Sequence, residues 1–135
     1  MNADKAFFDT IILLYLLSQD ETKADRAESL LAGGGLISVQ VLNELAFVSL
    51  RKLKMPWNEI REILFLVRGM CKVESLTVET HEQGLFLAER YGFSIYDAMI
   101  TASALISGCH TLFTEDLQNG QLIENRLTIS NPFVS

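Results

Sequence analysis

Acidic residues stand at four places in this sequence where a carboxylate could take part in a reaction. Asp9 directly follows a short apolar run, and Glu44 lies within a helical pattern beside apolar neighbours. Asp97 falls in the first turn of a helix that is otherwise small and apolar. The pair Glu115 and Asp116 follows another apolar run. A buried carboxylate without a partner is costly, so these acids either have ordinary structural partners or receive a cation.

Each acid also has a simpler structural explanation. Asp9 could cap the helix that follows it, a role for which Asp is well suited. Glu44 could sit at the edge of its helix with the carboxylate in water. Asp97 fits a capping pattern with Ser94, and the acidic pair could belong to a turn before Asn119 and Gly120.

The acids are more informative as a set. If the strands before Asp9 and Asp116 are neighbours in a parallel sheet, their carboxylates converge at one edge, where open α/β sheets place their sites. Two carboxylates about 4 Å apart repel by roughly 4 kcal/mol at an effective dielectric constant near 20, so the group needs protons or cations. The set contains oxygen ligands only, which favours Mg²⁺ or Mn²⁺ and, with it, hydrolysis of phosphodiester bonds.

The elements that would position these acids follow from hydrophobic periodicity. Short apolar runs alternating with amphipathic stretches predict an α/β fold whose parallel sheet is covered on both faces. Strands are expected at 6–8, 36–38, 73–76, 110–113 and 127–129. Helices are expected at 11–17, 20–32, 39–52, from Pro56 through 67, and at 77–91 and 94–107, with Gly92 as a C-terminal cap.

Composition limits the remaining possibilities. The 135 residues suit one domain over 1–135, and 49% of them are apolar. The net charge of −6 argues against a protein that holds nucleic acid mainly through a broad basic surface. Cys71 and Cys109 form neither a metal motif nor a disulfide framework. With no expected signal peptide or membrane span, a cytoplasmic location is the expectation.

Four segments carry a resemblance to a known family. They are Phe8-Asp9-Thr10, the run from Ser38 to Glu44, the run from Ser94 to Ala98, and Leu112 to Gly120. Each is weak alone, but together and in this order they resemble a PIN-domain ribonuclease. The resemblance is closest to a VapC-type toxin of a type II toxin–antitoxin system, and it covers nearly the whole chain.

The resemblance implies a PIN-like three-layer α/β fold with about five strands in a short parallel sheet and helices on both faces. It also implies a catalytic metal site that binds Mg²⁺ or Mn²⁺ through Asp9, Glu44, Asp97 and Asp116. Thr114 would support this site, and Glu115 would be a neighbour of it. Further implications are cleavage of RNA, a homodimer, and inhibition by a cognate antitoxin.

The family's antitoxin groove lies among the N-terminal helices. The candidates to line it here are Leu13, Leu16, Leu17, Leu50, Leu53, Met55 and Trp57. For the leucines, the alternative is the core or a dimer interface. Trp57 could instead be a hydrophobic staple at the start of its helix or an interface anchor.

Ile11 departs from the family pattern, which usually has an asparagine after Asp9-Thr10. An amide there would orient the site, so its loss bears on catalytic efficiency. This leaves a second hypothesis, a catalytically weak member that acts as a regulatory or partner-binding module. A phospho-accepting receiver domain is disfavoured, because the chain has no acid pair after its first strand and no lysine after residue 72.

Overall fold

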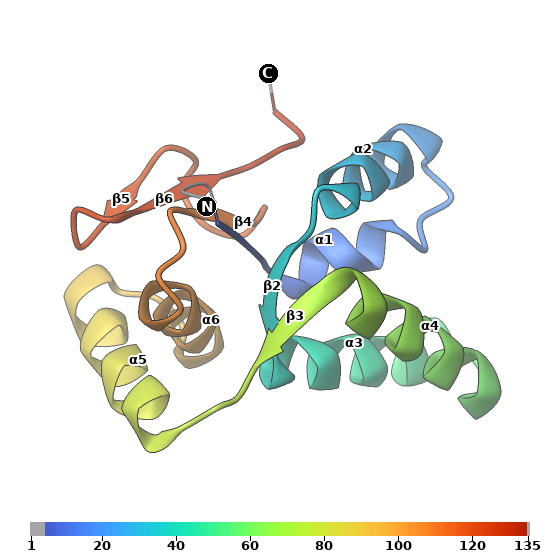
Figure 1. Ribbon diagram of the computed structural model, residues 1–135, viewed down its shortest axis with the longest axis horizontal. Coiled ribbons are helices and arrows are strands. Elements are labelled where there is room, and N and C mark those ends of the chain that lie inside the picture. Colours follow the sequence, from blue (N-terminus) through green and yellow to red (C-terminus); the bar gives the residue numbers. More distant parts are fainter. Residues whose placement is uncertain (1–4, 135) are drawn as a thin grey trace.

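The computed structural model describes residues 5–134 and arranges them as a sheet between two groups of helices (Figure 1). The strands are Ala6–Phe8 (β1), Gly35–Ser38 (β2), Cys71–Glu74 (β3), Thr111–Phe113 (β4), Leu122–Ile123 (β5) and Leu127–Ser130 (β6). The helices are Thr10–Tyr15 (α1), Glu21–Ala32 (α2), Val39–Arg51 (α3), Trp57–Met70 (α4), Val78–Tyr91 (α5) and Ile95–Ile106 (α6). None of the described helices combines the length and the apolar character needed to cross a membrane.

The sheet has the strand order β3-β2-β1-β4-β6-β5, and all neighbouring pairs are parallel except β5 with β6. Helices α1 to α4 cover one face and α5 with α6 the other (Figure 1). The predicted α/β architecture with helices on both faces is therefore confirmed. It also places β1 and β4 side by side at the centre of the sheet, with Phe8 opposite Phe113.

The described residues form six strands where about five were expected, because β5 adds a short strand at the edge of the sheet. This strand has two residues and pairs antiparallel with β6 through a tight hairpin, in which the Arg126 N–H donates to the Ile123 carbonyl at 3.0 Å. The two turn residues, Glu124 and Asn125, both have positive φ (51° and 58°). Such a turn usually carries glycine or asparagine, so a glutamate at its first position concealed the hairpin in the sequence.

Several boundaries differ slightly from expectation. The third strand begins at Cys71 rather than at residue 73, because α4 runs directly into it without an intervening polar turn. His110 lies just before β4 and is exposed, not within the strand. Gly92 ends α5 with φ of 75°, as expected for a left-handed C-terminal cap.

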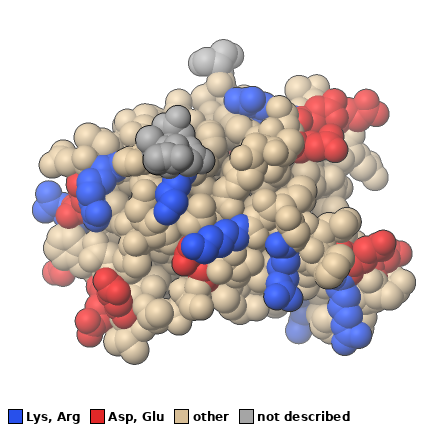
Figure 2. Space-filling model, in the orientation of Figure 1, with Lys and Arg blue, Asp and Glu red and all other residues tan. Residues whose placement is uncertain are grey.

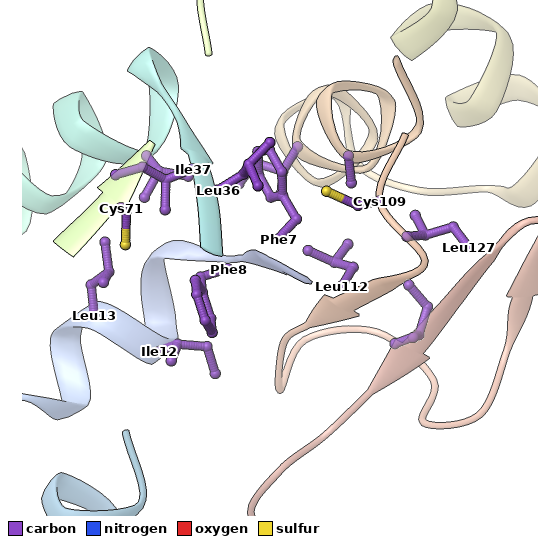
Figure 3. Close-up of a cluster of buried hydrophobic side chains, with 14 of the residues drawn as sticks. Phe7, Phe8, Ile12, Leu13, Leu36, Ile37, Cys71, Cys109, Leu112 and Leu127 are labelled. Carbon is purple, nitrogen blue, oxygen red and sulfur yellow. The ribbon is translucent and has the colours of Figure 1, made fainter. Parts of the chain in front are cut away.

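The core lies on both sides of β1. Phe7 and Phe8 are both fully buried, and successive strand residues point to opposite faces of a sheet. Figure 3 shows Phe8 next to Ile12 of α1, whereas Phe7 lies toward α6. Leu112 of β4 is buried beside them. This packing fixes the ends of β1 and β4, from which two of the four predicted acids emerge.

Candidate metal centre

Asp9 and Asp116 emerge from the carboxyl ends of the two central strands. Asp9 directly follows β1 and Asp116 comes three residues after the end of β4. The Asp9 N–H donates to the Phe113 carbonyl at 3.0 Å, which extends the pairing of the two strands by one residue. The prediction that these acids meet at one sheet edge required their two strands to be neighbours. In the sheet, β1 and β4 are adjacent.

Asp97 approaches the same edge from the first turn of α6. Ser94 caps this helix, and its Oγ accepts a hydrogen bond from the Asp97 N–H at 3.2 Å. The cap holds the backbone N–H of Asp97, while the Asp97 carboxylate faces the other acids. Burial raises the pKa of this carboxylate, and a hydrogen bond from Ser94 opposes the rise. One carboxylate oxygen from each of Asp9, Asp97 and Asp116 lies within 4.8 Å of the others. This trio of carboxylates is called the acidic cluster below.

Asp9 is the most tightly held member of the acidic cluster, with an exposed fraction of only 5%. It caps α1, and its Oδ1 accepts a hydrogen bond from the Thr10 N–H at 2.6 Å. Its Oδ2 accepts a second bond from the Thr114 hydroxyl, also at 2.6 Å. The Thr114 oxygen in turn accepts the Asp116 N–H at 3.0 Å. The capping role and the metal-site geometry therefore coexist in this one residue.

The electrostatics of the acidic cluster favour a cation. The pKa of Asp9 is raised from 3.8 to about 7, chiefly by burial, with the negative charges of Asp116 and Asp97 adding to the effect and the Thr114 and Thr10 hydrogen bonds opposing it. Burial also raises the pKa of Asp97, with the charges of Asp116 and Glu44 adding to the effect. A group of carboxylates that resists ionisation is stabilised by protons or by a bound cation.

Glu44 lines the same cavity but is not one of the three acids whose oxygens lie within 4.8 Å. Its Oε1 accepts a hydrogen bond from the Thr10 hydroxyl at 2.5 Å, and its Oε2 accepts one from Gln40 Nε2 at 2.9 Å. Gln40 Nε2 also donates to the Tyr96 carbonyl at 3.1 Å. Glu44 is thus held by α1 and by its own helix, at the side of the acidic cluster.

The acidic cluster opens into a cavity of about 770 Å³ with a largely apolar wall. The apolar and aromatic residues lining it are Ile11, Leu14, Phe47, Val48, Leu76, Tyr96 and Met99. None of the seven residues expected to line a groove beside the site is among them. Leu13 is 1% exposed and lies in the core, which was the expected alternative to the groove for the leucines. Leu53 and Trp57 are exposed away from this cavity.

Glu115 points away from the acidic cluster, as expected for a neighbour. Its carboxylate accepts hydrogen bonds from the Tyr15 hydroxyl and from Lys23. Sequence reasoning did not identify Tyr15, Lys23 or Gln40 as part of the site. Gln40 lay within a segment that resembles the family, but Tyr15 and Lys23 carried no comparable signal.

The donor set fits a hard divalent cation. It consists of carboxylate oxygens that converge on one point, held by hydroxyl and backbone donors. Mg²⁺ and Mn²⁺ prefer such oxygen ligands, whereas Zn²⁺ and Cu²⁺ sites usually include histidine or cysteine. The acidic cluster could therefore bind a divalent metal through Asp9, Asp97 and Asp116.

Comparisons with solved structures agree with this architecture. A toxin–antitoxin complex from Klebsiella pneumoniae has a TM-score of 0.74 at 19% identity, over 96% of this chain and 98% of that chain. VapBC2 from Rickettsia felis, solved with a promoter DNA fragment, has a TM-score of 0.67 at 22% identity. The match covers 93% of this chain and 97% of that chain. Mycobacterium tuberculosis VapC20, a toxin that cleaves the sarcin–ricin loop, has a TM-score of 0.62 at 18% identity. The match covers 80% of this chain and 87% of that chain. At these identities the likeness concerns the fold.

Sequence comparison gives the family itself. Curated proteins yielded no match to the chain. The family model of the PIN domain, in contrast, matches residues 6–119, a span that runs from β1 past all three members of the acidic cluster. The chain therefore belongs to the PIN domain family.

Proposed function

We propose that this protein is a metal-dependent endoribonuclease that acts as the toxin of a toxin–antitoxin pair. The observation that supports this most is the convergence of Asp9, Asp97 and Asp116 within 4.8 Å at the carboxyl ends of β1 and β4. Membership of the PIN family and the fold shared with solved VapC and VapBC proteins point the same way.

In this proposal the acidic cluster holds Mg²⁺ or Mn²⁺, and Glu44 is the fourth acid of the site. A bound divalent ion would activate a water molecule for attack on a phosphodiester and offset negative charge on the phosphate. The chain's own contribution is positioning. Thr10 and Thr114 fix both oxygens of Asp9, and Thr10 with Gln40 fixes both oxygens of Glu44.

The cavity suits a flexible, single-stranded RNA. Phe47 and Tyr96 line it and are 59% and 69% exposed, so their rings are accessible for stacking by bases. On the face shown in Figure 2, acidic and basic side chains are interspersed, so that face offers no broad basic surface among the described residues. With a net charge of −6, the phosphate backbone would be met mainly at the metal centre.

The partners in this proposal are a cognate antitoxin and a second copy of the chain. Several solved relatives by fold are complexes of toxin and antitoxin. The apolar wall of the cavity, with exposed Phe47 and half-buried Leu14, is a surface that an inhibitory segment could cover.

Ile11 supports a second candidate function, a catalytically weak PIN protein that acts by binding a partner. Its side chain lines the cavity where the family usually has an asparagine. Metal binding without RNA cleavage would favour this alternative.

The test is incubation of a mixed RNA pool with the purified, antitoxin-free protein in Mg²⁺, in Mn²⁺ and in EDTA. Cleavage that needs the metal and is lost in Asp97→Asn would support the ribonuclease. The Asp97→Asn variant keeps the backbone N–H of residue 97, which donates to the Ser94 cap. Cleavage that continues in EDTA, or at full rate in the variant, would contradict the proposal.

A further inference from the structure

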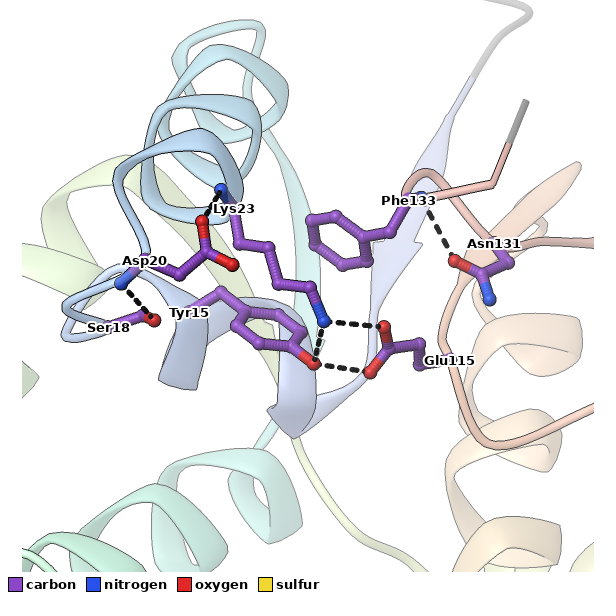
Figure 4. A network of polar contacts seen from close by, with 7 residues as sticks. All are labelled: Tyr15, Ser18, Asp20, Lys23, Glu115, Asn131 and Phe133. Carbon is purple, nitrogen blue, oxygen red and sulfur yellow. Dashed lines mark hydrogen bonds and ion pairs between the residues drawn. The ribbon is translucent and has the colours of Figure 1, made fainter.

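Tyr15, Lys23 and Glu115 form a compact polar group at the loop after β4, in which Glu115 directly precedes Asp116 (Figure 4). The Tyr15 hydroxyl donates to Glu115 Oε1, and Lys23 Nζ donates to the Tyr15 oxygen at 3.0 Å. Lys23 Nζ also pairs with Glu115 Oε2 at 3.4 Å and lies 4.5 Å from the centre of the Tyr15 ring. Three separate segments, α1, α2 and the loop after β4, therefore meet in this clamp, the name used below for these three residues.

The clamp ties the far end of α1 to the loop that carries Asp116. At the near end of α1, Asp9 accepts a hydrogen bond from Thr114. At the far end, Tyr15 donates to Glu115, which directly follows Thr114 in the chain. A single six-residue helix thus holds two consecutive residues immediately before Asp116. Asp116 itself is exposed and follows directly after these two attached residues.

The C-terminal segment covers the clamp. The Phe133 ring lies edge-on to the Tyr15 ring, with 4.6 Å between centroids, and Lys23 Nζ lies 5.6 Å from the Phe133 ring centre. The Lys23 side chain is 35% exposed, less than the cations of the Lys72–Glu74 and Arg90–Glu124 pairs at 73% and 59%. The C-terminal segment therefore packs against two of the three clamp residues.

We propose that Tyr15, Lys23 and Glu115 are positioning residues that fix Asp116 at the metal centre. None of the three is a metal ligand in this proposal, and their effect passes through the backbone of residues 114–116. The inference rests on the proposed function, because it assigns the clamp a role in divalent-metal binding. Groups that orient metal ligands commonly change metal affinity by about 10-fold to 100-fold when they are removed.

The charges of the clamp could also change metal affinity directly, without positioning Asp116. Two variants separate this electrostatic explanation from positioning. Tyr15→Phe removes a hydrogen bond and changes no charge, so an effect on metal affinity would come from positioning. Lys23→Met removes a positive charge near the acidic cluster. Simple electrostatics would then tighten binding of a cation, whereas loss of positioning would weaken it.

The chain offers a matched control far from the site. Tyr91 donates to Glu124 Oε2 at 2.8 Å, and Arg90 Nε pairs with the same oxygen at 3.0 Å. This group also combines a tyrosine, a carboxylate and a cation, but it joins α5 to the β5–β6 turn. Tyr91→Phe therefore makes the same chemical change at a place that does not carry a residue of the acidic cluster.

The experiment measures Mn²⁺ affinity by calorimetry and amide hydrogen exchange of residues 114–117 in the metal-free protein. Tyr15→Phe should bind Mn²⁺ about 10-fold more weakly than the wild type, and its amides at 114–117 should exchange faster. Lys23→Met should also bind Mn²⁺ more weakly. Tyr91→Phe should match the wild type in both Mn²⁺ affinity and amide exchange. Equal behaviour of Tyr15→Phe and Tyr91→Phe, or tighter Mn²⁺ binding by Lys23→Met, would overturn the proposal. If the wild type bound no Mn²⁺, the proposed function would fail. The exchange comparison would then decide the clamp's role, with faster exchange in Tyr15→Phe supporting it and equal exchange overturning it.

Discussion

Thr114 Oγ1 donates a 2.6 Å hydrogen bond to Asp9 Oδ2, across 105 positions of the sequence. The same oxygen accepts the Asp116 N–H, so one hydroxyl touches two members of the acidic cluster. Thr114 is fully buried at the end of β4, where its backbone is fixed by pairing with β6. One buried threonine of the sheet edge thus joins Asp9 to Asp116.

Replacing Thr114 by valine should weaken both the fold and the site. The change keeps the shape of the side chain but leaves Asp9 Oδ2 and the Asp116 N–H without this partner, at a cost of about 1–3 kcal/mol in the free energy of unfolding. Urea unfolding and Mn²⁺ titration measure the two effects. Thr101→Val is the control, because its buried hydroxyl donates only to the Asp97 carbonyl of its own helix, at 2.8 Å. Equal losses in the two variants would contradict the role assigned to Thr114.

Asp9 gives the metal-free protein a defined pH dependence. Burial raises its pKa from 3.8 to about 7, so the folded chain binds this proton more tightly than the unfolded chain does. The free energy of unfolding should therefore fall as the pH rises from about 4 to 7. Asp9→Asn retains a capping residue and should be more stable than the wild type at pH 8, by on the order of 1–4 kcal/mol, with the gain disappearing near pH 4.

Urea unfolding in EDTA at about pH 4, 6 and 8 checks this prediction. Asp20→Asn makes the same change at the exposed cap of α2, where the carboxylate accepts the N–H groups of Thr22 and Lys23. A gain for Asp9→Asn at pH 8 that did not exceed that of Asp20→Asn would show that burial of Asp9 does not oppose its ionisation.

Much of this fold follows from local signals in the sequence. Ser38 and Ser94 cap the helices that begin after them, and Gly92 ends α5 in the left-handed region. Apolar runs marked the longer strands. The strand β5 was not predicted, because two residues are too few to show a periodic pattern and the turn after it begins with a glutamate.

The three acids that converge were predictable because they lie next to strand ends or a helix start. Asp9, Asp97 and Asp116 are of this kind, and the order of parallel strands brings them together. The partner of Glu115, in contrast, is a tyrosine 100 positions away. Contacts of this kind depend on side-chain packing between distant segments, which neither spacing nor periodicity encodes. The cavity wall was missed for the same reason.

Gln40 should affect the reaction more than the fold. Its amide joins Glu44 to the Tyr96 carbonyl and so links α3 to the start of α6, beside Asp97. Gln40→Met should slow RNA cleavage by about 10-fold and change the free energy of unfolding by less than about 1 kcal/mol, because the lost bonds are only partly buried. Cleavage rates at saturating metal measure the effect. Gln83→Met, on α5, is the matched control, and equal rates for the two variants would contradict the role of Gln40.

Ile11 offers a test of the catalytically weak alternative. Ile11→Asn places an amide in the cavity at the position where the family usually has one, and it should accelerate RNA cleavage several-fold if orientation by that amide limits the wild type. Ile11→Leu keeps the site apolar and serves as the control. A rate for Ile11→Asn at or below that of Ile11→Leu would show that this position does not limit catalysis.

The most direct test of the central claim measures metal binding and RNA cleavage in the same samples. Mn²⁺ is titrated into the wild type and into Asp116→Asn, and free Mn²⁺ is followed by electron paramagnetic resonance while cleavage is followed on a gel. We expect the Mn²⁺ concentration for half-maximal cleavage to coincide with the dissociation constant of the site, and both values to rise together in Asp116→Asn. Cleavage that saturates independently of Mn²⁺ binding, or that is unchanged in Asp116→Asn, would contradict the claim that the acidic cluster is the catalytic metal centre.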